Sequence, residues 1–296
     1  MSNDILKNFI LSHTKEINSN DFKPLYSEAL DNYGPTAVIP KLTDILIDAG
    51  INPLLYMDCV PSCYAYGLNL SSVVIPNNVT SIHNSAFYGC SKLTNVTIPN
   101  SVTSINNFAF YKCKGLTSII IPNRVTSIGD AAFSGCEGLT SITIPDSVTS
   151  MGDYAFEGCS GLKSVTIGNS VTRIGYDAFY NCRGLTSITF GNSVTSIGSY
   201  AFSSCTGLTS VTIPDSVTSI GENAFYNCTG LTSVTIGNSV TSIGRSIFTN
   251  CNNLKEITFN GTVKQWNAIK KESKWSYGAP ENIKIICKDG EVVNAK

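Results

Sequence analysis

Cysteine and histidine are the residues of this chain that could do redox or metal chemistry. The chain has 11 cysteines but only 2 histidines, His13 and His83. Zinc sites need closely spaced sulfur or imidazole ligands, and the sequence has no CxxC, so the nearest candidate pair is Cys59 with Cys63. A helical-face or capping role suits that pair better than ligation. We therefore predict that the chain binds no metal and no cofactor.

Eight of the cysteines recur at a fixed period, which favours packing over chemistry. They are 23 residues apart, and each follows a phenylalanine by three residues. Cysteine often behaves as a small buried hydrophobic residue, so we interpret this set as part of a core. The odd total of cysteines and the lack of a signal peptide favour free thiols. The eight are Cys90, Cys113, Cys136, Cys159, Cys182, Cys205, Cys228 and Cys251.

The sequence shows no recognisable set of residues that could act together as nucleophile, base and acid. Neither His13 nor His83 belongs to a recognisable nucleophile–base arrangement. Acidic residues such as Asp130, Asp153 and Asp177 stand at variable positions of the repeat, and we interpret them as solvated charges. We predict that the chain is not an enzyme, and we keep an enzyme with a site in the N-terminal region as an alternative.

Each 23-residue unit predicts the same short elements of secondary structure, and these elements position the residues discussed above. Residues 139–161 are an example. Ile142 and Ile144 alternate with polar residues, which predicts a short β-strand with one buried face. The Pro-Asp pair at 145–146 predicts a turn, and the Gly-Asn pairs of other units do the same. Each unit therefore begins with a strand and a turn.

The second half of the unit predicts three further features. Residues 148–151 repeat as Val and Ile in most units, which indicates a second short extended segment. Gly152 recurs as glycine, asparagine or histidine, the residues that best tolerate a positive φ. Ala155 and Phe156 are followed by Cys159 at a spacing that would place them on one face of about one helical turn. We therefore expect a short helix to close each unit.

A strict period of this length is typical of a solenoid. One unit buries about six large apolar side chains at about 2 kcal/mol each, whereas ordering its backbone costs at least about 1 kcal/mol per residue. A single unit cannot fold alone, so neighbouring units must add hydrogen bonds and cover its two faces. The repeated leucines from Leu70 to Leu254 count nine such coils.

The unit resembles the BspA-like class of leucine-rich repeats over residues 68–260, reading L-x-x-I-x-I-P-x-x-V-x-x-I-G-x-x-A-F-x-x-C-x-x. The resemblance implies an α/β repeat solenoid, a right-handed leucine-rich-repeat horseshoe with a parallel concave sheet and short helices on its convex side. It also implies a role in adhesion or protein recognition and does not imply an enzyme. The departures are mild: glycine or asparagine replaces proline after four strands, and Met151 replaces isoleucine.

The two ends of the chain differ from the repeats and predict caps. Residues 1–66 carry helix-type apolar patterns, which predict a helical N-terminal cap on the solenoid of about nine coils at 67–260. Residues 261–296 are expected to form a C-terminal cap. There Val263 and Trp266 keep the register of the coils, and a β-hairpin with an Asp-Gly turn would cover the sheet edge.

Charge and hydropathy exclude two classes of partner. The net charge is -1 with 14% charged residues, so the electrostatic footprint of a nucleic-acid binder is absent. No apolar run approaches the roughly 18 residues of a membrane helix, so we expect no membrane insertion. The N-terminus lacks the basic start and apolar core of a signal peptide. A cytoplasmic chain is the default, and a cell-surface or secreted location would fit a processed or truncated chain.

We predict a noncatalytic recognition or adhesion module that binds a protein, or a surface glycan, through the solenoid surface. Alternation in the strands points a threonine row outward, and tyrosines flank the phenylalanines on the convex side. Ice binding through the Ser-x-Thr rows is an alternative, although Ile120 interrupts the row. The candidate ligand-binding residues are Thr143, Thr166, Thr189, Thr212 and Thr235 of the row, with Lys163, Arg173 and Arg183, which break the repeat.

Overall fold

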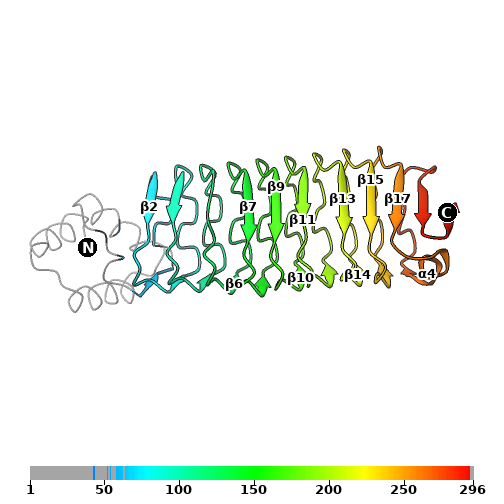
Figure 1. Ribbon diagram of the computed structural model, residues 1–296. Coiled ribbons are helices and arrows are strands. Elements are labelled where there is room, and N and C mark those ends of the chain that lie inside the picture. Colours follow the sequence, from blue (N-terminus) through cyan, green and yellow to red (C-terminus); the bar gives the residue numbers. More distant parts are fainter. Residues whose placement is uncertain (1–42, 44–51, 53, 55–57, 63, 294–296) are drawn as a thin grey trace, which may run out of the picture.

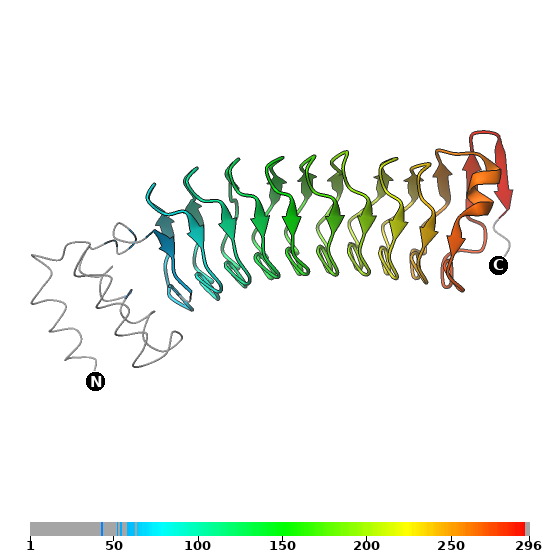
Figure 2. The same cartoon turned by 90° about the horizontal axis from the view of Figure 1, so that it is seen from below.

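The coils stack along one axis into an elongated array of parallel strands (Figures 1 and 2). The computed structural model describes residues 43, 52, 54, 58–62 and 64–293. The helical N-terminal cap expected at 1–66 falls almost wholly outside these residues. Most coils contribute a main strand, a two-residue strand and a series of turns, so the array has three long sides.

The main strands run parallel and in register, and their burial alternates as the sequence predicts. In β7, Ile142 and Ile144 are buried while Ser141 and Thr143 are exposed. Thr143 pairs with Thr166 of the next coil, 23 residues further on. The main strands are β2 (Ser72–Val74), β4 (Asn95–Thr97), β7 (Ser141–Ile144), β9 (Ser164–Ile167), β11 (Ser187–Thr189), β13 (Ser210–Ile213), β15 (Ser233–Ile236) and β17 (Glu256–Phe259).

The main sheet is broken into pieces, which the uniform repeat does not predict. Hydrogen-bonded neighbours form three groups among the described strands: β2 with β4, β7 to β11, and β13 onward. Residues 118–121 form no strand. At the other break, Phe190 replaces the isoleucine that ends β9 and β13, and it stays half-buried with its ring edge-on to Phe202 at 5.8 Å. The larger ring needs more room than isoleucine, and β11 ends one residue earlier than its neighbours.

A second ladder of two-residue strands follows the second extended segment of each coil, as predicted. It is divided between β8 and β10 into two parallel groups. The strands of this short sheet are β1 (Cys59–Val60), β3 (Ser81–Ile82), β5 (Ser104–Ile105), β6 (Ser127–Ile128), β8 (Ser150–Met151), β10 (Arg173–Ile174), β12 (Ser196–Ile197), β14 (Ser219–Ile220), β16 (Ser242–Ile243) and β18 (Lys270–Lys271).

The prediction that a short helix closes each coil is wrong. The segment that contains the repeated phenylalanine and cysteine consists of consecutive turns, and it forms the turn side of the array. Tyr154 and Gly158 have positive φ angles of 59° and 66°, and equivalent residues do so in the other coils. A left-handed residue at every fourth position cannot continue an α-helix. The N–H groups point to the next coil instead, as when Phe156 donates to the carbonyl of Ala178 at 2.8 Å. The turns thus join neighbouring coils rather than forming helices.

The prediction that glycine recurs at Gly152 because the position needs a positive φ is also wrong, since the φ of Gly152 is not in the left-handed region. A Cβ placed there would lie 2.4 Å from Oδ1 and 2.5 Å from the backbone nitrogen of Asp130 in the preceding coil. The glycine therefore permits close approach of two coils. The positive φ falls two residues later, at Tyr154 in this coil.

Phenylalanine rings form a continuous stack in the core. Phe87 and Phe110 have ring centroids 5.1 Å apart and nearly parallel planes, and the same contact repeats down to Phe225 and Phe248 at 5.9 Å. All eight stacked phenylalanines are fully buried. Stacked aromatic pairs add stabilisation beyond their buried area. The eight are Phe87, Phe110, Phe133, Phe156, Phe179, Phe202, Phe225 and Phe248.

Polar side chains tie each coil to its neighbour outside the core. Asp153 accepts the backbone N–H of Tyr176 at 2.7 Å. In the same way, Thr126 donates its hydroxyl to the carbonyl of Thr103 at 3.2 Å, and these bonds recur along the array. Many of the repeated threonines therefore serve the stack rather than a ligand.

The C-terminal segment differs from the expected continuation of the coils. Val263 and Trp266 lie in α4 (Val263–Ala268), a helix that Thr262 begins with a capping box to Gln265. Trp266 is buried edge-on to Phe259 at 5.4 Å. The chain then forms β19 (Lys284–Cys287), parallel to β17, and β20 (Gly290–Val293), antiparallel to β19. A hairpin thus ends the main sheet in the described residues, and its role as a cap stays a prediction.

Truncating one stacked ring should show that the phenylalanine stack is the core. We expect Phe156→Ala to lower the free energy of unfolding by about 3–5 kcal/mol, as for other buried aromatics. The control Thr143→Ala, at an exposed position, should change it by less than about 0.5 kcal/mol. Urea unfolding followed by circular dichroism measures both. A loss below about 1 kcal/mol for Phe156→Ala would contradict this assignment.

Candidate functional site

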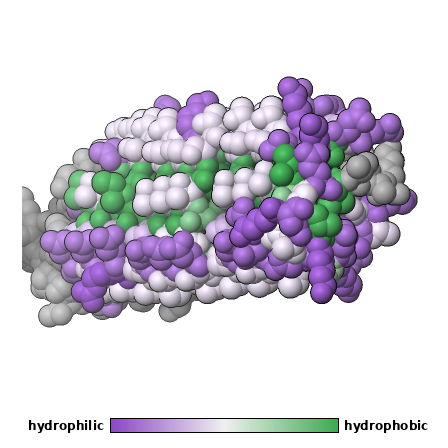
Figure 3. All heavy atoms as spheres, turned by 45° about the vertical axis from the view of Figure 1, so that its right-hand side comes forward, coloured by the Kyte–Doolittle hydropathy of each residue, from purple (hydrophilic) through white to green (hydrophobic). Residues whose placement is uncertain are grey.

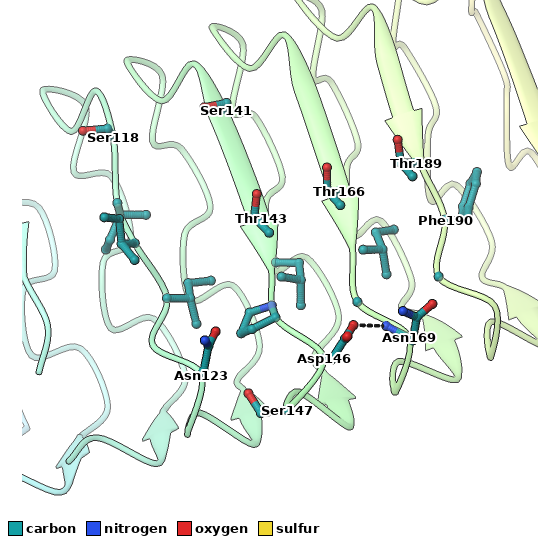
Figure 4. A pocket seen from close by; sticks show the side chains of 18 residues that line it. Ser118, Asn123, Ser141, Thr143, Asp146, Ser147, Thr166, Asn169, Thr189 and Phe190 are labelled. Atoms are coloured by element: carbon teal, nitrogen blue, oxygen red, sulfur yellow. Dashed lines mark hydrogen bonds between the residues drawn. The ribbon is translucent and has the colours of Figure 1, made fainter. Parts of the chain in front are cut away.

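A hollow of about 890 Å³ lies on the outer face of the main sheet, near the carboxyl ends of β7, β9 and β11. Figure 4 shows Thr143, Thr166 and Thr189 side by side above it, one from each strand. The irregular segment 118–121 forms one end, and Phe190 lies at the other. We call this feature the main-sheet hollow. It coincides with the middle piece of the broken sheet.

The three threonines of the hollow have hydroxyls that no other described residue binds. Thr143, Thr166 and Thr189 are exposed, and none makes a side-chain hydrogen bond within the described part of the chain. Thr126 and Thr149, in contrast, donate to backbone carbonyls of the preceding coil. A hydroxyl both donates and accepts a hydrogen bond. The hollow therefore offers a row of polar groups that are free to bind another molecule.

The two ends of the hollow are apolar. Ile120 replaces threonine in the outward row and is 83% exposed, an unusual state for an isoleucine. At the opposite end, the half-buried ring of Phe190 replaces an isoleucine. Gly168 and Gly191, which replace proline, place no side chain over the intervening lining. The hollow thus combines apolar ends with a hydroxyl-rich centre.

Charge in the hollow comes from one ionisable residue of its lining, Asp146. Oδ1 of Asp146 accepts the backbone N–H of Asn169 at 2.6 Å, as the dashed line in Figure 4 shows. Asn123 and Asn169 line the same rim. The rim is therefore polar and weakly acidic.

The structure brings three of the eight predicted ligand-binding residues together in this hollow. Thr212 and Thr235 continue the outward row on β13 and β15, beyond the break in the sheet. Lys163 is exposed just before β9. The structure confirms that these threonines point outward, and their role in binding stays a prediction.

The two predicted arginines lie away from the hollow. Arg173 is in β10 of the short sheet and forms an ion pair with Asp153 at 3.4 Å. It lines a separate hollow of about 510 Å³ together with the serines of β12, β14 and β16. Arg183 donates to Oδ1 of Asn181 at 2.8 Å. These arginines do not converge with the threonine row on one site.

Tyrosines on the turn side stack on one another, which uses their ring faces. Tyr66 and Tyr88 are 4.6 Å apart with nearly parallel planes, and Tyr88 stacks on Tyr111 at 4.7 Å. A second group packs edge-on, with Tyr154 at 5.3 Å from Tyr176. Ring faces engaged in this way are not platforms for a sugar. The tyrosines are therefore weaker candidates than the main-sheet hollow.

Figure 3 shows how the surface of the array is organised. Side chains of similar hydropathy gather in rows along the long axis, because each row repeats one position of the coil. Hydrophobic, neutral and hydrophilic rows lie next to one another on this face.

Sequence reasoning missed several residues of the hollow. Phe190, Asn123, Asp146 and Asn169 line it but were not predicted as binding residues. The signal that could have found the hollow was the position of the departures, since Ile120, Phe190 and the two glycines fall in neighbouring coils. A flat, continuous hydroxyl array of the kind that ice binding requires is interrupted by these same residues and by the sheet breaks.

The repeated cysteines are buried thiols that bond to the stack. Cys136 donates its Sγ–H to the carbonyl of Phe110 at 3.2 Å, and the other coils repeat this contact. No group of three or more His, Cys, Asp or Glu residues suited to a metal ion occurs among the described residues. Cys63 and His13 lie outside those residues. The interpretation of the eight cysteines as core residues is confirmed by their burial.

The chain belongs to the BspA-type leucine-rich repeat family. The model for the BspA type Leucine rich repeat region matches in 6 copies, over residues 60–186 and 172–287. No curated protein matches the chain significantly. Within the described residues, no helix is long and apolar enough to cross a membrane.

Solved structures of bacterial leucine-rich repeat proteins are similar to this chain. A leucine-rich repeat protein from Bacteroides ovatus ATCC 8483 is 27% identical and has a TM-score of 0.55, with 76% of this chain and 68% of that chain covered. A leucine rich cell surface protein from Faecalibacterium prausnitzii A2-165 is 34% identical over 69% of this chain, with a TM-score of 0.47, and the chain spans 63% of its length. The T. pallidum leucine-rich repeat protein is 33% identical, with a TM-score of 0.47, and the match covers 50% of this chain and 69% of that protein.

The buried thiols should make stability fall at alkaline pH. Burial raises the pKa of Cys159 and of Cys205 from 9.0 to about 12. Between those values the unfolded chain releases thiol protons that the folded chain keeps, so the free energy of unfolding decreases as pH rises. The slope is about 1.4 kcal/mol per pH unit for each thiol. Urea unfolding from pH 7.5 to 9.5 should be flat at first and then fall.

A variant with Cys159→Ala and Cys205→Ala is the matched comparison, since it removes two of these thiols. Its free energy of unfolding should fall less steeply above pH 9 than that of the unmodified chain. The eight repeated cysteines of the folded chain should also resist a thiol reagent that labels the unfolded chain at once, whereas Cys59 is only half-buried. An equal slope in the two proteins, or rapid labelling of Cys159 or Cys205 in the folded chain, would contradict the assignment.

Proposed function

We propose that the chain is a noncatalytic recognition or adhesion module that binds a protein through the main-sheet hollow. The observation that carries the proposal is the row of exposed hydroxyls of Thr143, Thr166 and Thr189, which no described residue uses. The leucine-rich repeat family supports it, because a stack of coils offers a long surface rather than a catalytic centre. The proposal applies equally to a cytoplasmic and to a surface-displayed chain.

The chemistry of the hollow suits a protein partner. Specific interfaces combine an apolar centre or anchor with polar groups that form hydrogen bonds, and the hollow supplies Ile120, Phe190 and the threonine row in one place. Burial of apolar surface stabilises a complex by roughly 25 cal/mol per Å². Ile120 at 83% exposed therefore has most of its burial energy still available to a partner.

A glycan partner fits the hollow less well. Sugars are commonly held by exposed aromatic faces together with planar polar side chains, and the aromatic residue here, Phe190, is half-buried and packs on Phe202. On the turn side, Tyr88 lies between Tyr66 and Tyr111, which stack on its ring. Protein recognition is therefore the function that the described residues support best.

The test places three charges in the hollow without disturbing the core. We expect Thr143→Glu, Thr166→Glu and Thr189→Glu together to leave the chain folded with a modestly lower melting temperature, since exposed substitutions usually cost within about 0.5 kcal/mol each and like charges on adjacent strands repel. Bulk and unpaired charge should nevertheless abolish binding at this face. Quantitative mass spectrometry of proteins cross-linked to the chain in a cell extract compares this variant with the unmodified protein.

The matched control carries the same charges on the short sheet, as Ser104→Glu, Ser127→Glu and Ser150→Glu. Captured proteins that are lost with the hollow variant and kept with the control support the proposal. Proteins that both variants keep, or that both lose equally, would move the binding surface elsewhere or show that capture is nonspecific. A glycan array probed with the same three proteins separates a carbohydrate ligand from a protein.

A further inference from the structure

Four departures from the repeat line the main-sheet hollow. Residues that are the same in every coil are explained by duplication and packing, but a residue that differs on the surface of one coil is not. Ile120 stands for threonine and Phe190 for isoleucine, and both line the hollow. Two of the four replacements of proline, Gly168 and Gly191, line it as well. The hollow is therefore specific to this chain rather than to its repeat.

The size of the hollow suits a short segment rather than a folded domain. Its volume of about 890 Å³ lies within the range of roughly 300–1,000 Å³ that is typical of ligand sites. The apolar ends lie in the third and sixth coils, three coil spacings apart. At about 4.8 Å for each spacing, this distance is about 14 Å, close to the 13 Å of four residues in an extended chain. Alternate side chains of such a segment would reach both ends.

The centre of the hollow meets the needs of an extended backbone. An extended segment has N–H and C=O groups that lack intramolecular partners, and burying them unpaired is costly. The hydroxyls of Thr143, Thr166 and Thr189 can donate and accept, and neighbouring coils space them by about one strand separation. The amide side chains of Asn123 and Asn169 add donors and acceptors at the rim.

The negative charge of Asp146 favours a basic residue in a bound segment. Asp146 is exposed, and it is the ionisable residue in the lining of the hollow. Its Oδ1 is bound to the backbone of Asn169, which leaves Oδ2 for a further donor. A lysine or arginine of the partner would pair with this carboxylate, whereas an acidic segment would be repelled.

We infer that the main-sheet hollow binds an extended peptide segment that carries two apolar side chains four residues apart and a lysine or arginine between them. The inference rests on the proposed function and names its partner class. Ile120 and Phe190 contact the two apolar side chains, the threonine row binds the peptide backbone, and Asp146 pairs with the cation.

A phage-displayed library of random dodecamers, panned on the full chain, tests the sequence of the segment. We expect enriched peptides to share two apolar residues four positions apart, with a basic residue between them. The best peptide, labelled with fluorescein, is then titrated with the full chain by fluorescence anisotropy. Enrichment of acidic peptides, or no enrichment over a blank surface, would overturn the inference.

Variants that restore the repeat test the contacts. Ile120→Thr and Phe190→Ile should each weaken binding of the selected peptide by about fivefold or more, because each removes apolar contact area. The control is Val74→Thr, since Val74 is 65% exposed in the same outward row but lies outside the hollow. It should leave the affinity unchanged. An equal loss from Val74→Thr, or no loss from Ile120→Thr, would place the peptide elsewhere.

The charge contact has its own variant. Asp146→Asn should weaken binding of the basic peptide several-fold and reduce its dependence on salt. An unchanged salt dependence would overturn this contact.

The proposed function and the peptide inference can fail separately. If the triple glutamate variant loses its captured proteins but no peptide is enriched, recognition through the hollow stands and the peptide inference is wrong. If that variant keeps its captured proteins, recognition through the hollow is itself wrong.

Discussion

Backbone hydrogen bonding between each coil and the next is the interaction on which the rest of this structure depends. It operates on all three long sides, as the bonds from Lys163 to Thr140, from Gly152 to Ile128 and from Phe156 to Ala178 show, each at 2.8 Å. Because the coil-to-coil distance is thereby set by the backbone, every repeated side chain meets its own counterpart at nearly that distance. The phenylalanine stack follows from this geometry, and so do the cysteine contacts and the Asx and threonine bonds between coils.

The same constraint explains which parts of the fold could be predicted from the sequence. The alternation of Ile142 and Thr143, the core positions of Phe156 and Cys159 and the number of coils depend on period and hydropathy alone, and the structure confirms them. The helix predicted after Gly152 depends on where the N–H groups find acceptors. Local spacing cannot distinguish a helical turn from turns bonded to the next coil, because both put Ala155, Phe156 and Cys159 on the inner side.

Residues that relate two coils were the least predictable. Gly152 looked like a residue chosen for its φ, yet its role is to let the coil approach Asp130 of the coil before it. The sheet breaks at residues 118–121 and at Phe190 likewise depend on how unlike coils fit together. For the candidate site, the sequence predicted the outward row, including Thr143, Thr166 and Thr189. It did not predict that these three threonines, and not Thr212 or Thr235 of the same row, line one hollow.

A uniform solenoid faces a conflict between stacking and specificity. Stacking favours identical residues in every coil, because each side chain must fit its own copy, but identical rows offer a partner no unique register. Surface positions relieve the conflict, since a change there disturbs the stack little. Ile120 leaves the phenylalanine stack intact, with Phe110 and Phe133 still 5.3 Å apart. Phe190 costs one residue of β11 and a break in the sheet, but the rings of Phe179 and Phe202 beside it remain stacked at 5.4 Å. Specificity in this chain can therefore be read from the few outward residues that differ between coils, and the many that agree report on folding.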